Sequence, residues 1–119
     1  MTMDPLCATV LVRGLEDWLH LADIDWLVRN KFPDSAGPDV PRLAAGVIAT
    51  LVEGGFVQVG DVTDGGFMEW DDSAEVVRLR IEAQWLALDR AAAPGDVCWV
   101  ANTAKGDECA REMLRVREQ

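Results

Sequence analysis

The residues with the most evident chemistry are carboxylates that gather in the middle of the chain. Between Leu43 and Val77 there is no Lys or Arg, while the same stretch carries seven acids: Glu53, Asp61, Asp64, Glu69, Asp71, Asp72 and Glu75. A surface of this kind repels phosphate and attracts a partner with a basic cleft. Phe67, Met68 and Trp70 lie among the acids, and aromatic and methionine side chains are enriched at interface cores whose rims are polar. We therefore predict a protein-binding site formed by Asp61, Asp64, Glu69, Trp70, Asp71, Asp72 and Glu75.

A structural interpretation of the same segment stays open. Acids in turns and at helix caps are commonly no more than a solvated face. Phe67 and Met68 are adjacent, so on a strand they point to opposite faces, and one of them can belong to the core. Trp70 can pack under the helix that follows it. Trp18, Trp26, Trp85 and Trp99 are interpreted as core or near-core residues, with Trp26 the best candidate for exposure.

Catalytic chemistry finds little support in the residue pattern. His20 is the only histidine, and no spacing places Ser35, Ser73 or a cysteine within reach of it, as nucleophilic catalysis requires. Gly54-Gly55 and Gly65-Gly66 lack the Lys and Ser/Thr of a phosphate-binding loop. The acids around residue 64 do not follow the alternation of a calcium loop. We therefore predict a non-enzymatic protein with no cofactor.

The cysteines indicate packing. Cys7, Cys98 and Cys109 are odd in number and widely spaced, whereas a disulfide framework or a zinc site needs close pairs of ligands. We expect buried small hydrophobic side chains, and no metal site.

Composition sets the class of protein. The chain has 119 residues, a net charge of −10 and 50% hydrophobic residues, which suits one globular domain over residues 1–119. No apolar run reaches the roughly 20 residues of a membrane span, and the first residues lack the basic region of a secretory signal. We therefore expect a cytoplasmic protein without membrane contact.

Local patterns predict five helices. Asp4-Pro5 starts the first, and Leu6, Val10, Leu11, Leu15 and Trp18 follow it with helical spacing. A short extended piece is expected near 19–21, and a second helix over 23–30. The third, over 41–53, has a one-sided apolar stripe and ends at Gly54-Gly55. The fourth follows the caps at 71–73 and ends by Pro94-Gly95. The fifth spans about 103–117.

Three strands are expected between these helices. Residues 56–62 and 67–70 form a hairpin around the turn at 63–66, where glycine permits positive φ. Residues 96–101 form the third strand. The pattern predicts an α+β protein, rich in helix, with a small three-stranded antiparallel sheet.

Two segments resemble winged-helix domains. Residues 51–57, Leu-Val-Glu-Gly-Gly-Phe-Val, resemble the end of a winged-helix recognition helix entering its wing. Residues 99–110, with Thr-Ala-Lys-Gly at 103–106, resemble the wing strand and following helix of bacterial winged-helix regulators. The resemblance covers about 40–70 and 97–113 and implies a winged-helix-like fold. The helix at 74–90 departs from that pattern and would be an insertion.

The charges disfavour the usual winged-helix ligand. Such domains insert the third helix into the DNA major groove, with Arg or Lys at phosphates. The expected outer face of this helix consists of Arg42, Ala45, Gly46, Ala49, Thr50 and Glu53, and the wing tip at 63–66 is acidic. Nucleic acid is therefore not the expected partner. A DNA-binding winged-helix transcription regulator remains the alternative, and it would need a cluster of Arg13, Arg29, Lys31 and Arg42.

The whole chain also resembles a group of small acidic actinobacterial proteins. They share an Asp-Trp-Leu start, a Gly-Phe-x-x-Trp middle and an Asn-Thr-x-x-Gly end, all of which occur here. Acidic proteins of this size often serve as immunity partners of bacterial toxins. The resemblance implies an immunity protein, or antitoxin, that neutralises a basic, nuclease-type toxin.

Overall fold

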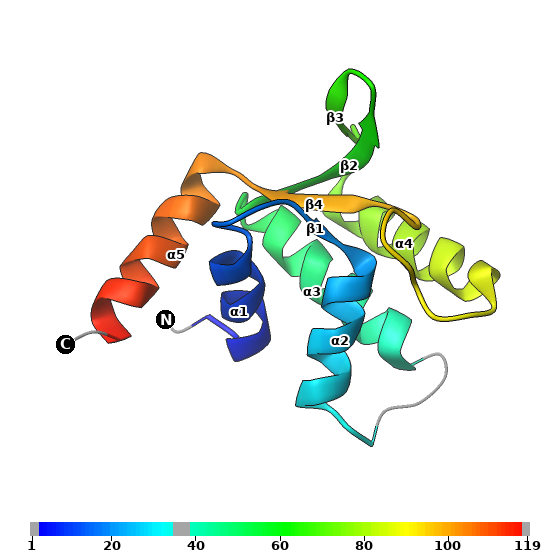
Figure 1. Ribbon diagram of the computed structural model, residues 1–119, viewed down its shortest axis with the longest axis horizontal. Coiled ribbons are helices and arrows are strands. Elements are labelled where there is room, and N and C mark those ends of the chain that lie inside the picture. The colour runs from blue at the N-terminus through cyan, green and yellow to red at the C-terminus, as the bar shows by residue number, and fades with distance from the viewer. Residues whose placement is uncertain (1–2, 35–38, 118–119) are drawn as a thin grey trace.

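Five helices and one sheet make up the fold, and a computed structural model describes residues 3–34 and 39–117 of it. The helices are α1 (Pro5–Arg13), α2 (Leu21–Lys31), α3 (Asp39–Glu53), α4 (Ala74–Leu88) and α5 (Ala104–Arg117). The strands are β1 (Leu19–His20), β2 (Val57–Thr63), β3 (Gly66–Glu69) and β4 (Trp99–Asn102). The predicted α+β class is confirmed (Figure 1).

The sheet has four strands, so the prediction of three is wrong. Its order is β1-β4-β2-β3, and every neighbouring pair is antiparallel. The additional strand is β1, in which Leu19 pairs with Val100 and His20 with Trp99. Two residues are too few to show the period-two alternation that identifies a strand. β1 is a strand only because β4, far along the chain, lies beside it.

Local signals set several helix boundaries. The Asp4 side chain accepts hydrogen bonds from the backbone N–H groups of Leu6 (2.9 Å) and Cys7 (3.4 Å) and so caps α1. The Ser73 hydroxyl caps α4 by accepting from the Val76 N–H at 3.3 Å. α4 ends at Leu88, before the expected Pro94-Gly95, because Asp89 takes the left-handed conformation (φ 53°).

The first helix is shorter than predicted and stops at Arg13. The next residue, Gly14, faces Asn102: a Cβ added there would lie 2.3 Å from the Asn102 side-chain oxygen. The Asn102 amide in turn donates to the Leu11 carbonyl at 2.9 Å. This tertiary contact occupies the end of α1, and Trp18 therefore lies beyond the helix and is 41% exposed.

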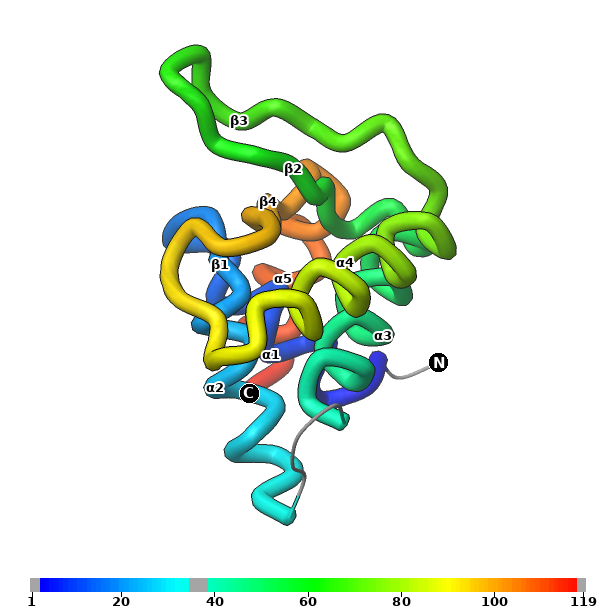
Figure 2. Tube along the Cα trace, turned by 90° about the vertical axis from the view of Figure 1, so that its right-hand side faces the viewer, coloured from blue at the N-terminus to red at the C-terminus, as the bar shows by residue number. Residues whose placement is uncertain are grey.

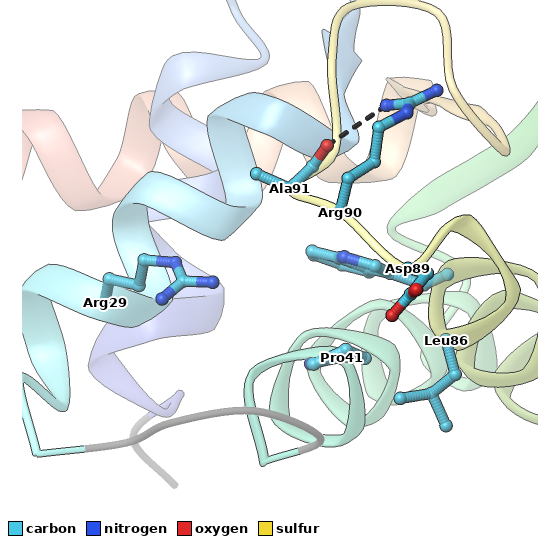
Figure 3. A pocket seen from close by; sticks show the side chains of 7 residues that line it. Arg29, Pro41, Leu86, Asp89, Arg90 and Ala91 are labelled. Carbon is cyan, nitrogen blue, oxygen red and sulfur yellow. Dashed lines mark hydrogen bonds between the residues drawn. The ribbon is translucent and has the colours of Figure 1, made fainter.

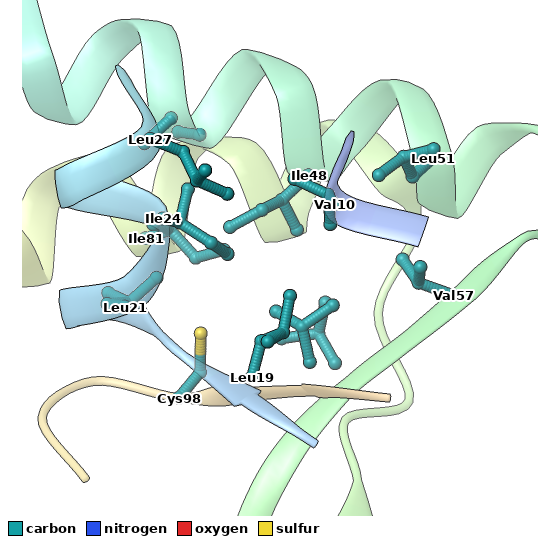
Figure 4. Packing of buried hydrophobic residues seen from close by; sticks show 14 of the residues in the cluster. Val10, Leu19, Leu21, Ile24, Leu27, Ile48, Leu51, Val57, Ile81 and Cys98 are labelled. Atoms are coloured by element: carbon teal, nitrogen blue, oxygen red, sulfur yellow. The ribbon is translucent and has the colours of Figure 1, made fainter. Parts of the chain in front are cut away.

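The core lies between the helices and one face of the sheet. Leu11, Leu21, Ile24, Ile48 and Ile81 are fully buried there, and every helix contributes to one connected apolar cluster. Figure 4 shows Leu21, Ile24, Ile48 and Ile81 packed together in this cluster. Cys7 and Cys98 belong to it, as expected, while Cys109 is partly buried at its edge. All three are free thiols. The helices lie below the sheet in Figure 1, and the β2–β3 hairpin extends beyond them.

The two segments that resemble winged helices contact each other. The Thr103 hydroxyl donates to the Gly55 carbonyl at 2.7 Å, and the Lys105 ammonium donates to the Gly54 carbonyl at 2.6 Å. Gly106 approaches so closely that a Cβ would lie 2.0 Å from the Phe56 carbonyl oxygen. These motif residues therefore fasten the start of α5 to the turn between α3 and β2.

The expected outer face of α3 is partly covered. α4 packs along α3 (Figure 2), and Ala45 and Ala49, which were expected to be exposed, are buried. Arg42, Thr50 and Glu53 remain exposed, as expected, and Gly46 is half-buried. The sequence showed only that these alanines lie off the main stripe, and small side chains at such positions allow a second helix to approach.

Candidate protein-interaction site

The predicted site lies on an arm formed by the β2–β3 hairpin. In its register Gly60 pairs with Glu69, Asp61 with Met68, and Val62 with Phe67. Gly66 has φ +98°, a conformation that favours glycine. Gly60 allows close pairing, because a Cβ there would lie 2.2 Å from the Met68 carbonyl oxygen. The arm projects away from the helices (Figures 1 and 2), with Asp64 exposed in its turn.

A polar cluster anchors the base of the arm. Trp70 keeps only 7% of its surface exposed, and its indole N–H donates to an Asp61 carboxylate oxygen at 3.0 Å. The Arg80 guanidinium of α4 lies 3.5 Å from the centre of the Trp70 ring and pairs with Asp72 at 3.2 Å. We call Asp61, Trp70, Asp72 and Arg80 the anchor cluster. It connects β2, the segment after β3 and α4.

Trp70 therefore does not lie on the surface that the sequence pattern indicated. The alternative, that it packs under the fourth helix, agrees with its position beneath Arg80. A buried indole needs an acceptor for its N–H, and Asp61 supplies one from the neighbouring strand. Trp70 can support the arm, but its ring offers a partner almost no surface.

Two of the predicted acids are neutralised within the chain. Asp72 pairs with Arg80, as above. Glu75 accepts a hydrogen bond from the Arg78 Nε at 3.1 Å, and this bond, together with the positive charge of Arg78, holds the pKa of Glu75 below its ordinary value. These two carboxylates contribute little net field towards a partner.

The other four predicted acids form the charged part of the site. Asp61, Asp64, Glu69 and Asp71 are exposed. Over residues 3–34 and 39–117, none of them lies within 4.0 Å of a cationic nitrogen. Asp61 accepts from the neutral Trp70 indole, and Glu69 accepts from the neutral Gln58 amide at 3.3 Å. We call these four residues the arm carboxylates; their charge is not compensated locally.

An aromatic contact beside the arm was missed by the sequence pattern. The Trp18 and Phe67 rings lie 5.4 Å apart, centre to centre, at an angle of 54°. Trp18 comes from the turn between α1 and β1, where helical spacing had suggested a buried position. Val62, opposite Phe67 in the hairpin, is 40% exposed. Trp18 precedes β1 and Phe67 lies in β3, at the opposite edge of the sheet, so no local signal could have revealed the contact.

The residues considered for catalysis lie apart. The His20 Nε2 is 3.5 Å from an Asp23 oxygen, and the imidazole packs edge-on against Trp99. Ser73 serves as the α4 cap, and Ser35 lies outside the described residues. Burial raises the pKa of the Cys7 thiol to about 11 and that of Cys98 to about 12, so both thiols stay protonated near neutral pH and are poor nucleophiles.

The basic residues that a DNA-binding alternative requires are dispersed. Arg29 and Arg90 line a hollow of about 330 Å³ between α2 and the end of α4 (Figure 3), yet Arg29 pairs with Asp25 at 2.7 Å and Arg90 with Asp96 at 2.6 Å. Arg42 lines a different hollow, and its guanidinium lies near Asp39. Arg13 lies over the exposed Trp26. Arg13, Arg29 and Arg42 thus line three different hollows, and Lys31 is exposed at the end of α2.

Neither a metal-binding cluster nor a membrane-spanning helix occurs among the described residues. Among the described residues, no group of three or more His, Cys, Asp or Glu side chains is arranged to hold a metal ion. None of the described helices has both the length and the apolar character needed to cross a bilayer. Comparison with protein-family models, curated proteins and solved structures finds no match to the chain.

Proposed function

We propose that the protein is a non-enzymatic protein-binding module whose β2–β3 arm enters a basic cleft of its partner. The observation that carries this proposal is that Asp61, Asp64, Glu69 and Asp71 are exposed on one anchored arm and form no ion pair among the described residues. Complementary fields of this kind raise association rates, up to about 10⁸–10⁹ M⁻¹s⁻¹ at low salt. A partner of matching chemistry is a basic nuclease-type toxin, which makes this chain its immunity protein.

The anchor cluster supports the same proposal. An arm that is already ordered loses less conformational freedom on binding than a flexible loop does. Trp70, held by Asp61 and by Arg80, ties the arm to α4. The exposed Trp18 and Val62 and the half-buried Phe67 supply apolar area beside the charges, in keeping with a binding surface that combines an apolar centre with a charged rim.

A second candidate is a DNA-binding winged-helix regulator, which the resemblance of residues 51–57 and 99–110 implies. It is favoured by the projecting hairpin that follows α3. Against it stand the acidic turn of the hairpin and the packing of α4 along α3. Titration with duplex DNA at low salt separates the two: a regulator binds, whereas the protein proposed here shows no measurable affinity because phosphate meets the arm carboxylates.

The decisive experiment is rescue from toxicity. We expect co-expression with the product of the adjacent gene to yield a complex and to abolish that product's toxicity. The variant Asp64→Lys/Glu69→Lys should lose rescue and should slow association about tenfold or more at low salt. Its matched control, Glu53→Lys/Glu108→Lys, makes the same charge change at exposed acids outside the arm and should retain rescue.

The control makes the outcome specific. If both double variants lose rescue equally, net charge rather than the arm is responsible, and the arm is not the binding site. If the wild-type protein neither binds nor protects, the immunity proposal is wrong. Asp72 is unsuitable for such a test, because reversing its charge would also disturb Arg80 and Trp70.

A further inference from the structure

Helix α4 is apolar on two opposite faces. Val77, Ile81 and Trp85 are buried on the side that meets the rest of the protein. A helix at the surface of a globular protein normally carries charged and polar residues on its outer side. The outer side of α4 instead exposes Val76, Leu79, Ala83 and Leu86, with 53% of Leu79 and 46% of both Val76 and Leu86 accessible. We call these four residues the outer stripe.

The spacing of the outer stripe is that of a helix-pairing surface. The intervals of three, four and three residues place the side chains on one line, as the a and d positions of a heptad do. Single exposed apolar residues are ordinary, whereas a contiguous row marks an interaction site. From Val76 to Leu86 the row is about 15 Å long, within a helix of 15 residues. It lies outside α3, at the edge of the molecule (Figures 1 and 2).

Charges beside the stripe indicate its occupant. Glu75 lies on one flank with 66% of its side chain exposed, and Arg80 lies on the other flank with 38% exposed. They occupy a g position and the following e position, which approach each other across a parallel helix pair. Each is already paired within its own chain, Glu75 with Arg78 and Arg80 with Asp72. Two parallel copies of α4 would extend these pairs into a network by bringing Glu75 of each near Arg80 of the other. An antiparallel pair would instead bring the Glu75 and Glu82 flanks of both copies together, which is unfavourable.

We propose that the outer stripe of α4 binds a second copy of this chain, with the two α4 helices side by side and parallel. The arrangement is isologous, because the same patch meets itself about a two-fold axis. It does not depend on the proposed function, since it uses none of the arm carboxylates. Each copy carries a net charge of −10, so the copies repel each other at low salt, and added salt should strengthen the dimer by screening this repulsion.

Analytical ultracentrifugation of the full chain, from low micromolar to several hundred micromolar, tests the proposal. We expect a reversible monomer–dimer equilibrium that shifts towards dimer as salt rises. Leu79→Glu should be monomeric throughout. Val116→Glu, the matched control on α5, removes an apolar side chain that is 62% exposed and should dimerise as the wild type does. A wild-type chain that stays monomeric, or a Leu79→Glu variant that dimerises normally, would overturn the proposal.

A cross-link tests the parallel orientation and serves if Leu79→Glu fails to fold. With Glu75 at g and Arg80 at e, Ala83 occupies an a position. In a parallel helix pair each a position faces its own copy, so Ala83→Cys should form a disulfide-linked dimer on mild oxidation. Gln84→Cys, one residue off the stripe, and the wild type with its three cysteines are the controls. Equal cross-linking of Ala83→Cys and Gln84→Cys contradicts the pairing. Failure here leaves the toxin-rescue result unaffected, so the two proposals are tested separately.

Discussion

The β2–β3 arm and helix α4 share the anchor cluster, yet they expose opposite chemistry. The arm presents Asp61, Asp64, Glu69 and Asp71, whereas α4 presents Val76, Leu79 and Leu86. Charge acts over about 8 Å at physiological ionic strength, while apolar burial acts only at contact. The arm therefore favours rapid, salt-sensitive association with a cation-rich partner, and α4 favours a contact that survives high salt.

The two regions differ also in whether their acids form ion pairs with arginine. On the arm, Asp61 and Glu69 accept only from neutral donors, the Trp70 indole and the Gln58 amide. On and near α4, Asp72 and Glu75 are each paired with an arginine. The field of an acidic segment therefore depends on which of its carboxylates the fold neutralises, and the number of acids in the sequence overstates it.

Trp70→Ala should have the largest effect, because Trp70 couples the arm to α4. The change empties a buried site, leaves Asp61 without its donor and uncovers Arg80. We expect a loss of about 3–5 kcal/mol in the free energy of unfolding, measured by urea denaturation. Trp70→Phe keeps a ring beneath Arg80 and removes the N–H, so it should cost about 1–3 kcal/mol. A Trp70→Ala variant as stable as the wild type would show that the cluster does not anchor the arm.

Two glycine substitutions, one in the arm and one in α3, should change the free energy of unfolding in opposite directions. A Cβ at Gly60 would lie 2.2 Å from the Met68 carbonyl oxygen, so Gly60→Ala forces the two strands apart and should destabilise by about 1–3 kcal/mol. Gly46, in α3, has no atom within 4 Å of such a Cβ. Gly46→Ala should therefore stabilise the protein by up to about 1 kcal/mol. Thermal melting of both variants checks the prediction, and equal effects would contradict it.

Alkaline pH should act on the protein through Cys98, which lies near Asp61 and Arg80. Burial, with a smaller contribution from Asp61, raises the pKa of this thiol from 9.0 to about 12. The folded state holds the proton more tightly, so the stabilisation is fully present below pH 9 and is lost as pH rises towards 12. The urea midpoint should therefore fall over this range. Cys98→Ala should reduce the fall, and the remaining fall should reflect Cys7, whose pKa burial raises to about 11.

The smallest effect is expected at the paired acid Glu75. Because Arg78 lowers its pKa, the pair contributes above the ordinary pKa of a glutamate, and the contribution fades as pH falls. Its exposure makes that contribution minor. The double change Glu75→Gln/Arg78→Gln removes a neutral pair and should leave the rate of association with a cationic partner nearly unchanged, whereas Glu69→Gln should slow it. Stopped-flow measurements at low salt compare the two, and equal slowing would show that the arginine does not neutralise Glu75.

Much of the fold could be predicted because its signals are local. Asp4 and Ser73 were expected as helix caps and act as such, and the glycine-containing turn placed the hairpin within one residue. A short extended piece was expected near 19–21, but its place in the sheet could not be predicted, since Leu19 and His20 become a strand only by pairing with Val100 and Trp99. Trp18 was misplaced for a related reason, because Asn102 occupies the end of α1 before the helix reaches it.

The amino-acid sequence by itself determined the starts of α1 and α4, the hairpin and the concentration of acids at 61–75, because caps, turns and side-chain periodicity act within a few residues. The second and third helices begin two residues earlier than expected, at Leu21 and Asp39. The tertiary structure decided which of those acids keep their charge and which face of α4 stays open. The indole of Trp70 reaches Asp61, and Arg80 reaches Asp72, only after strand and helix have packed together. Contacts between separate elements thus pair Asp72 and Glu75 with arginines, and they leave the arm carboxylates exposed.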